Sequence, residues 1–343
     1  LGAAGEEGIQ PGDATDLARS FLSELMRAPD SSNAMGYISR VSVLDAQLYV
    51  EDRDRNIFWK APDASITLTR DSNGIRGHAR LKIVTETEHG EFDVSSMYSA
   101  ATGNLDLALA FQDVTPTLLA TIEPVIGGIQ RLNVPLSGTI AVNFDNNFQP
   151  NSVAFDLDGG VGTMTLPEYY AEPIQLQALE LMGSLTDGGD HLAVENAFID
   201  FGGPALGVQG VARRAEGTYG FELNANLIDV PVNVVDNLWP ESGSQSARDW
   251  VMSNMQNGIL ERATVRLSGN APTVNLTTIA ITVLAIDDAF IDLGGPTLGV
   301  QAVARRTESA YVFELNANLV DAPINMMGTL WPDGVGPRAR DWV

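Results

Sequence analysis

The chain has 343 residues, with 20 Lys or Arg against 44 Asp or Glu, so its formal net charge is −24. This charge disfavours nucleic acid as a partner, because phosphate-binding proteins need a basic face, and it disfavours electrostatic attachment to anionic lipid headgroups. The sequence contains no cysteine, which excludes disulfides, zinc–thiolate sites, iron–sulfur clusters and cysteine nucleophiles.

Residues 1–35 are predicted to form a loose, Gly-rich start followed by an amphipathic helix. Asp13 can cap a helix that runs to about Ala28, with Leu17, Phe21 and Leu25 on one face. The polar face of this helix is not basic, so we expect it to dock on a sheet or cap its end.

Residues 36–133 are predicted to form an antiparallel meander. From Tyr37 the apolar residues recur at every second position, with a one-residue slip after Val43. Turn signals such as 71–74 and 102–104 separate the runs, which indicates strands with one apolar and one polar face. Residues 115–131 are predicted to interrupt the strands with a helix that is interrupted or kinked at Pro124.

Residues 134–270 continue the strands, and residues 271–343 repeat part of them. Strands are expected around 136–144, 153–157, 161–164, 174–181, 192–201, 206–212 and 219–227, which brings the total to roughly 18. An open sheet rarely exceeds ~10 strands without curling, and the chain has too few helices to cover its apolar face. The predicted fold is mainly β: an elongated, twisted antiparallel sheet curled into an apolar groove, with a few short helices.

An internal duplication is the most distinctive feature of the sequence. Residues 198–251 align without gaps to 290–343, with 34 identities in 54 positions. Each copy ends in Leu-Trp-Pro followed by Ala-Arg-Asp-Trp-Val. We interpret this motif as a structural joint: an extended edge, a short capped helix over 247–257, and a return to strands. Its residues are Leu238, Trp239, Pro240, Ala247, Arg248, Asp249 and Trp250, and in the second copy Leu330, Trp331, Pro332, Arg340, Asp341 and Trp342.

The motif, with Asn254 and Gly258 after it, resembles the AsmA-like family of Gram-negative envelope proteins, in particular its YhdP type and more distantly its TamB type. The amphipathic strands and the expected helix at 115–131 fit the same family. The resemblance implies a largely periplasmic protein, anchored to the inner membrane by a segment that this sequence does not contain. It also implies a groove that carries phospholipid between the inner and outer membranes. The near-copy after 92 residues departs from the family pattern.

From this resemblance and from the alternating strands, we expect a passive conduit with phospholipid as its ligand and outer-membrane assembly proteins as further partners. The alternative is an envelope scaffold or assembly factor without a lipid path. The residues expected to line the groove are the alternating apolar ones: Leu48, Val50, Leu68, Leu81, Ile83, Leu105, Leu107, Phe111, Ile140, Val142, Phe144, Phe155 and Leu157.

No catalytic, metal or cofactor site is predicted. The three histidines, His78, His89 and His191, have no metal-ligand spacing, and residues 155–160 resemble a calcium loop without its later ligands. The arginine pairs at 213–214 and 305–306 are expected to form cross-strand ion pairs rather than headgroup sites. A glycosidase would need carboxylates paired across a cleft, and the sequence offers no way to pair them.

Overall fold

The computed structural model describes residues 20, 24, 37–52, 57–85, 88–122, 131–167, 170–234, 248–249, 252–253, 258–271, 280–292, 297–306 and 311–321. These residues form a mainly β structure with the short helix α2 (Pro116–Ile122) and the 3-10 turn η3 (Asp187–Gly189). The strands are β1 Arg40–Asp52, β2 Ile57–Asp71, β3 Gly74–Val84, β4 His89–Ser99, β5 Leu105–Val114, β6 Leu132–Asn133, β7 Leu136–Phe144, β8 Pro150–Gly159, β9 Gly162–Met164, β10 Ile174–Leu176, β11 Ala178–Thr186, β12 His191–Asp200, β13 Ala205–Ala215, β14 Thr218–Pro231, β15 Ile259–Ala271, β16 Ala280–Asp292, β17 Thr297–Arg306 and β18 Tyr311–Val320.

Fifteen of these strands form one antiparallel sheet that is not closed, and the other three form a small separate sheet in the order β10-β9-β6. In the large sheet the strands follow chain order, β1-β2-β3-β4-β5-β7-β8-β11 and on to β18. The chain divides into two compact units. The first unit holds residues 1–127 and 137–155, and the second holds 128–136 and 156–343.

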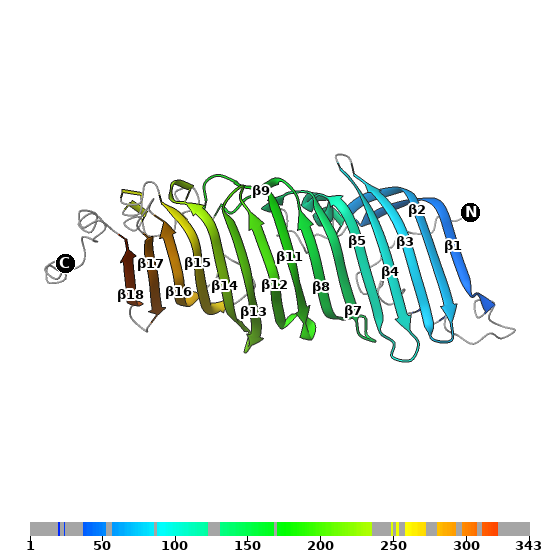
Figure 1. Cartoon of the computed structure of the whole chain (residues 1–343). Helices are drawn as coiled ribbons and strands as arrows, with labels where there is room; N and C mark the ends of the chain where they lie inside the picture. The colour runs from blue at the N-terminus through cyan, green and yellow to red at the C-terminus, as the bar shows by residue number, and fades with distance from the viewer. Residues whose placement is uncertain are drawn as a thin grey trace. The chain divides into compact units, whose positions relative to one another are not determined.

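In the first unit, β1 to β5 lie side by side as a meander (Figure 1). Short turns with polar caps join the strands; the Asp71 carboxylate accepts hydrogen bonds from the backbone amides of Asn73 and Gly74. Asp145 caps the β7–β8 turn in the same way through the amides of Asn147 and Gln149. These tight turns fix the register, so that apolar residues on neighbouring strands face each other.

The polar face of the first unit carries cross-strand ion pairs. Asp93 on β4 accepts from His78 and Arg80 on β3, at 3.0 Å and 3.1 Å. Lys82 and Glu91 pair one step further along, at 3.6 Å. All of these side chains are well exposed, so this face is stable in water and needs no covering layer.

Helix α2 covers one end of the apolar face of the first unit. Leu118 is fully buried, and a Cβ added to Gly90 would lie 2.9 Å from its side chain. Gly90 pairs with Ile83, which is 3% exposed, and the Phe92 and Phe111 rings lie beside them with centroids 6.3 Å apart. A glycine at position 90 is therefore required for the helix to approach the sheet this closely.

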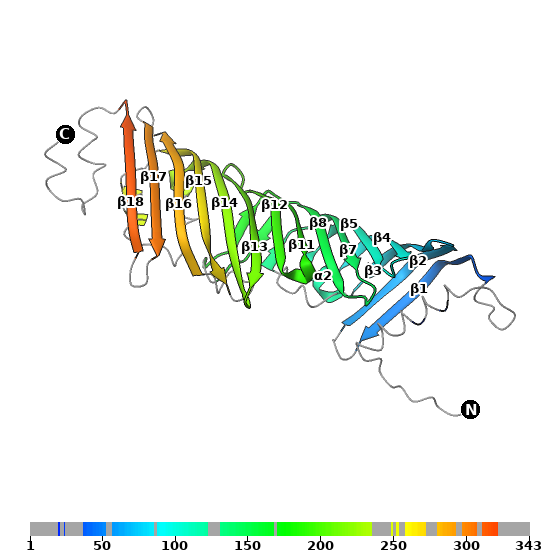
Figure 2. The ribbon, with the colours of Figure 1, turned by 90° about the horizontal axis from the view of Figure 1, so that it is seen from below.

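In the second unit, β11 to β18 lie side by side in chain order (Figures 1 and 2). Val232 and Met252, which belong to the connection between β14 and β15, lie against the apolar face at the end of these strands. Val232 in this connection and Leu298 on β17 form a buried cluster, against which Met252, Ile291 and Val300 pack. The Val232 amide donates to the Gly258 carbonyl at 2.9 Å, which closes the base of the connection.

The duplicated sequence forms duplicated structure, down to its irregularities. The β12–β13 register shifts between Val194 and Ala197, and the β16–β17 register shifts between Ile286 and Ala289, 92 positions later. Asp229 and Asp321, also 92 apart, have left-handed backbones with φ of 53° and 58°. Asp113 at the end of β5 shares this conformation, with φ of 51°, and aspartate tolerates it better than most residues. Helical residues follow Asp113 and Asp229 within three positions, so the same joint is used in both units.

The structure also changes several expected boundaries. The strand predicted over 174–181 is divided at Gln177 into β10 and β11, which belong to different sheets. The apolar positions change parity there, from 174 and 176 to 179 and 181, so one strand could not present them all on one face. The predicted 161–164 strand is β9, in the small sheet. Of the predicted 115–131 helix, residues 116–122 form α2, and 123–130 lie outside the described residues.

We predict that Leu118→Ala lowers the free energy of unfolding by about 2–4 kcal/mol, because it removes most of a fully buried side chain and leaves a cavity in its place. Urea unfolding followed by circular dichroism measures the loss. The matched control is Leu107→Ala on the half-exposed part of the same face, with an expected loss below about 1.5 kcal/mol. Equal losses would contradict the distinction between a covered and an uncovered part of this face.

Candidate functional site: an uncovered apolar strip

An unbroken row of apolar residues crosses seven strands of the second unit. Each residue lies directly opposite the next: Leu181 faces Ala197, and Ala197 faces Val208, in the printed register. The row continues in the same way to β17. Every member is half-buried, with none in the buried class. We name this row the second strip; its residues are Leu181, Ala197, Val208, Ala225, Val265, Ile286 and Ala302.

The first unit carries an equivalent row. Ile66 on β2 faces Ala79, Ala79 faces Val94, and Val94 faces Leu109. All four residues are half-buried, and Val43 on β1, which faces Ile66, is 44% exposed. We name Val43, Ile66, Ala79, Val94 and Leu109 the first strip.

Partial burial of this kind distinguishes an uncovered face from a packed core. In a filled core, apolar side chains in the middle of the sheet are buried by a second layer. Several buried residues of the face lie beside covering segments, such as Phe92 near α2 and Leu298 beside Val232, and Ile75 and Phe221 are also buried at the other ends of β3 and β14. Between these ends, neighbours on the sheet bury the sides of each residue of the two strips and leave part of its surface exposed.

The expected lining residues of the first unit occupy the same face as the first strip. Leu68, Leu81, Leu105 and Leu107 alternate in register with it and are half-buried. Leu48 faces Ala61 and is half-buried, whereas the side chain of Val50 lies outside the described residues. Ile83 and Phe111 share the face but are 3% and 5% exposed, so they belong to the end covered by α2.

The lining residues predicted on β7 and β8 can also be placed. Asn143 donates to Asp106 on the polar side of β5, which puts the alternating Ile140, Val142 and Phe144 on the apolar side. All three are half-buried. On β8, half-buried Phe155 and buried Leu157 alternate with exposed residues, and Leu157 is 8% exposed. Gly159 lies on the same face of β8 as Leu157 and is close to the side chains of Leu136 and Leu179. Leu157 therefore lies at a covered position.

The second strip was not among the residues predicted from sequence. Three of its seven members are alanines, which carry little hydrophobic signal. The register shift between Val194 and Ala197 also places these two residues on the same face although their numbers differ by three. The bulge leaves one signal in the sequence: a one-residue change in the alternation of apolar residues that occurs at the same place in β12 and β16.

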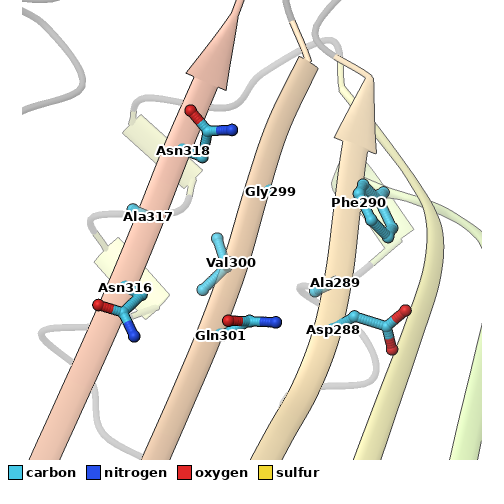
Figure 3. Close-up of a pocket in the computed structure, with 9 residues that line it drawn as sticks. All are labelled: Asp288, Ala289, Phe290, Gly299, Val300, Gln301, Asn316, Ala317 and Asn318. Carbon is cyan, nitrogen blue, oxygen red and sulfur yellow. The ribbon is translucent and has the colours of Figure 1, made fainter.

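The polar face of the second unit has a shallow hollow of about 280 Å³ beside the β16–β17 register shift between Ile286 and Ala289. Figure 3 shows Asp288, Gln301 and Asn316 side by side across three strands, with Phe290 and Asn318 along the same strands. Arg262 stacks on the Phe290 ring at 5.7 Å from its centroid and lies 4.0 Å from the Asp288 carboxylate. The ring approaches Gly299 from the side, so the hollow is formed by cross-strand packing around a glycine.

The expected ion pairs of the duplicated arginines are confirmed for one member of each pair. Arg214 lies 3.7 Å from Asp190, and Arg305 lies 3.5 Å from Glu314. Residues 155–159 of the calcium-loop-like segment lie in β8. No group of three or more potential metal ligands occurs among the residues that the structure describes. Within the same residues, no helix is both long enough and apolar enough to cross a membrane.

The Leu-Trp-Pro motif falls almost wholly outside the described residues. Arg248 and Asp249 are helical, as are residues 252–253, which agrees with the short helix predicted over 247–257. The residues Leu238, Trp239, Pro240, Ala247 and Trp250 lie outside the described part, and so do Leu330, Trp331, Pro332, Arg340, Asp341 and Trp342.

Comparison with known proteins gives no match: no family model, no curated protein and no solved structure is similar to this chain at a significant level.

The ion pairs of the polar face predict a pH dependence of stability. Partial burial acts to raise the pKa of Asp93, but hydrogen bonds from Arg80 and His78 and the attraction of their charges outweigh it and hold this pKa below 3.8. The ionised carboxylate is therefore favoured by folding. Its contribution is complete above the ordinary aspartate pKa and is lost as the pH falls through the lower folded-state pKa.

We predict that Asp93→Asn lowers the free energy of unfolding by less than about 1 kcal/mol near neutral pH, because the pair is exposed and screened. The difference from the original protein should vanish in strong acid. Urea unfolding at several pH values measures it, with Asp156→Asn on the exposed side of β8 as the control. A difference that grows towards low pH would contradict the assignment.

Proposed function

We propose that this protein is a passive conduit for lipid, in which the apolar face of the open sheet shelters phospholipid acyl chains. The observation that supports the proposal is the continuity of the two strips: within each unit, apolar residues face one another from strand to strand and stay half-exposed. The proposal includes no catalytic step and no cofactor.

The energetics of lipid transfer explain why such a surface would be useful. Each methylene moved into water costs about 0.8 kcal/mol, so a phospholipid with about 30 methylenes faces a barrier above roughly 20 kcal/mol. A row of half-exposed apolar side chains replaces water around the acyl chains and lowers this barrier. Since neighbouring strands are about 4.8 Å apart, each step along the row exchanges one set of apolar contacts for a similar one.

The composition of the strips suits a mobile ligand. The second strip combines alanine and branched aliphatic residues and has no hydrogen-bonding side chain, so it offers no specific anchor that would hold a lipid at one place. The polar face, with its ion pairs, remains in water. The net charge of −24 disfavours a fixed headgroup site for anionic lipid, which also agrees with transfer rather than storage.

The family and location remain part of the proposal. The Leu-Trp-Pro and Ala-Arg-Asp-Trp-Val motif supports membership of the AsmA-like family, of the YhdP or TamB type. The protein would then act in the periplasm of a Gram-negative bacterium, anchored to the inner membrane through a segment outside this sequence. Outer-membrane assembly proteins would be its further partners.

Site-specific photo-crosslinking tests whether lipid contacts the strips. We predict that a benzophenone amino acid at Leu107 or Val142 forms a covalent adduct with phospholipid in membrane extracts, detected by mass spectrometry. The neighbours Ala108 and Ala141 alternate with them on the opposite face and are the matched controls. Equal labelling at all four positions, or none at 107 and 142, would contradict a lipid path.

Charge in the strip should block transfer. We predict that Val142→Asp slows phospholipid exchange between donor and acceptor vesicles by at least about tenfold, because a carboxylate in the path must be desolvated when an acyl chain passes. Ala141→Asp, on the exposed face of the same strand, should leave the rate within about twofold. Circular dichroism establishes that both variants are folded.

The scaffold alternative gives the opposite results. If the apolar face instead receives a protein partner and no lipid, Val142→Asp would lose that partner and Ala141→Asp would keep it, while lipid exchange would be absent from the original protein as well. The covered ends near α2 and Val232 are compatible with either function, so the exchange rate of the original protein decides between them.

A further inference from the structure

The apolar face of each unit differs in chemistry between the two ends of its strands. At the end beside α2 or Val232, the residues of the face are apolar, as Ile83 and Val230 are, and both are buried. At the opposite end of the same strands, arginine and tyrosine occupy positions on this face. We name this opposite end the polar end, and its chemistry gives the apolar face a direction along the strands.

In the second unit, Arg214 and Tyr219 form the polar end. They face each other across β13 and β14 and alternate in register with Val208 and Ala225 of the second strip, so their side chains belong to the apolar face. The Arg214 guanidinium lies over the Tyr219 ring, 5.8 Å from its centroid. The half-buried Tyr219 is held by its hydroxyl, which donates to the Gly189 carbonyl of η3 at 3.1 Å. A fixed ring therefore supports an exposed guanidinium.

Asp190 places a negative charge beside this arginine. Its carboxylate lies 3.7 Å from the Arg214 guanidinium, and its backbone carbonyl accepts a hydrogen bond from the Arg214 amide at 2.7 Å. The Arg214 and Asp190 side chains are 50% and 57% exposed, so water screens the ion pair and it is weak. Such a pair can exchange its mutual contact for contacts with a ligand that carries both charges.

The first unit has the same residue types at its own polar end. Arg70 faces Ile75, and Ile75 faces Tyr98, so all three belong to the face of the first strip. Arg70 and Tyr98 are half-buried, on the two strands that flank buried Ile75. The duplicated segment repeats the pair, since Arg306 faces Tyr311. Arginine with tyrosine at this end is therefore a property of both units.

We infer that the polar end of each unit receives the headgroup of a zwitterionic phospholipid, with its phosphate against the arginine and, in the second unit, its ammonium group beside Asp190. This inference rests on the proposed lipid function and adds a direction to it: the acyl chains extend from the polar end over the strip. Arginine suits the phosphate because its planar fork of N–H donors can bind two oxygens. Tyrosine suits the boundary because its ring is apolar and its hydroxyl is polar. The adjacent carboxylate and the net charge of −24 favour a zwitterionic headgroup over an anionic one.

The length of the strands agrees with this direction. The hydrocarbon core of a bilayer is about 30 Å thick, so the acyl chains of one leaflet extend about 15 Å from their headgroups. At about 3.3 Å per residue, this length corresponds to roughly four to five residues along a strand. Counted from Tyr219, acyl chains would pass Phe221 and Leu223 and end near Ala225, which belongs to the second strip. The headgroup contacts then lie beside the strip and not within it.

Two spin-labelled phospholipids test the direction, one labelled on its headgroup and one at the end of an acyl chain. Methyl NMR of the intact chain follows Leu192 and Leu260. Leu192 lies on the apolar face at the polar end, opposite Ala212, and Leu260 lies on this face at the covered end, opposite Val230. We expect the headgroup label to broaden Leu192 strongly and Leu260 little, and the acyl label to broaden Ala225 more than Leu192.

The two labels separate the inference from the proposed function. If the acyl label broadens the second strip while the headgroup label broadens Leu192 and Leu260 equally, or Leu260 more, the inference is overturned and the lipid function stands. If neither label broadens any of these methyl groups, both are overturned. Shifts of Leu192 with inorganic phosphate alone, without broadening by the headgroup label, would indicate an ordinary anion site and would also overturn the inference.

Two triple variants with the same change in charge test the arginines. The first removes those on the apolar face and is Arg70→Gln, Arg214→Gln and Arg306→Gln. The matched control removes neighbouring arginines on the polar face and is Arg76→Gln, Arg213→Gln and Arg305→Gln. Circular dichroism establishes that both variants are folded.

Vesicle exchange of phosphatidylethanolamine is then compared with that of diacylglycerol with the same acyl chains, which has no phosphate. The first variant should slow phosphatidylethanolamine exchange by at least about fivefold and leave diacylglycerol exchange within about twofold, because only the phosphate loses a charge-assisted contact. The control should leave both rates within about twofold. Unchanged phosphatidylethanolamine exchange in the first variant, equal slowing of both lipids, or equal slowing by the control would overturn the inference.

Discussion

An amphipathic sheet must hide its apolar face, and this requirement governs the whole molecule. Within the described part of the chain, α2 and the residues around Val232 cover only parts of the apolar face of the two units. Helices or a second sheet usually supply the missing layer. In each unit the middle of the face stays half-exposed, while the polar face is satisfied by exposed ion pairs such as that of Asp93. The acyl chains of phospholipid, the ligand that we propose, would complete that layer.

The covered ends show how the chain limits the exposed area without closing the face. Each unit uses the same device: a strand ends near a left-handed aspartate, Asp113 or Asp229, and helical residues then follow. Buried Val114 and Val230 come directly after these aspartates. In each unit, this joint therefore turns the chain and buries one valine directly after the aspartate, at a small conformational cost. The duplication copied the aspartate of this joint, since Asp321 has the same left-handed conformation as Asp229.

Most of the strands could be predicted from sequence, because alternation of apolar and polar residues is a direct consequence of strand geometry. β3, β5 and β7 follow this rule, and the slip after Val43 coincides with the bulge at Asp45. The second strip could not be predicted in this way. Its alanines give a weak signal, and the bulge between Val194 and Ala197 changes the phase within one strand. The sequence also did not indicate that β9 and β10 form a separate sheet with β6, because strands of two or three residues are too short to show which sheet they join.

We propose that acyl chains lie on the apolar face of the sheet and not on its polar face, which can be tested by methyl NMR of the chain with a phospholipid spin-labelled in its acyl chain. We expect strong paramagnetic broadening of Val208 and Val265 in the second strip, and little effect on Val211 and Val303, which lie on the opposite face of the same sheet. Equal broadening of both pairs, or none in either, would contradict it.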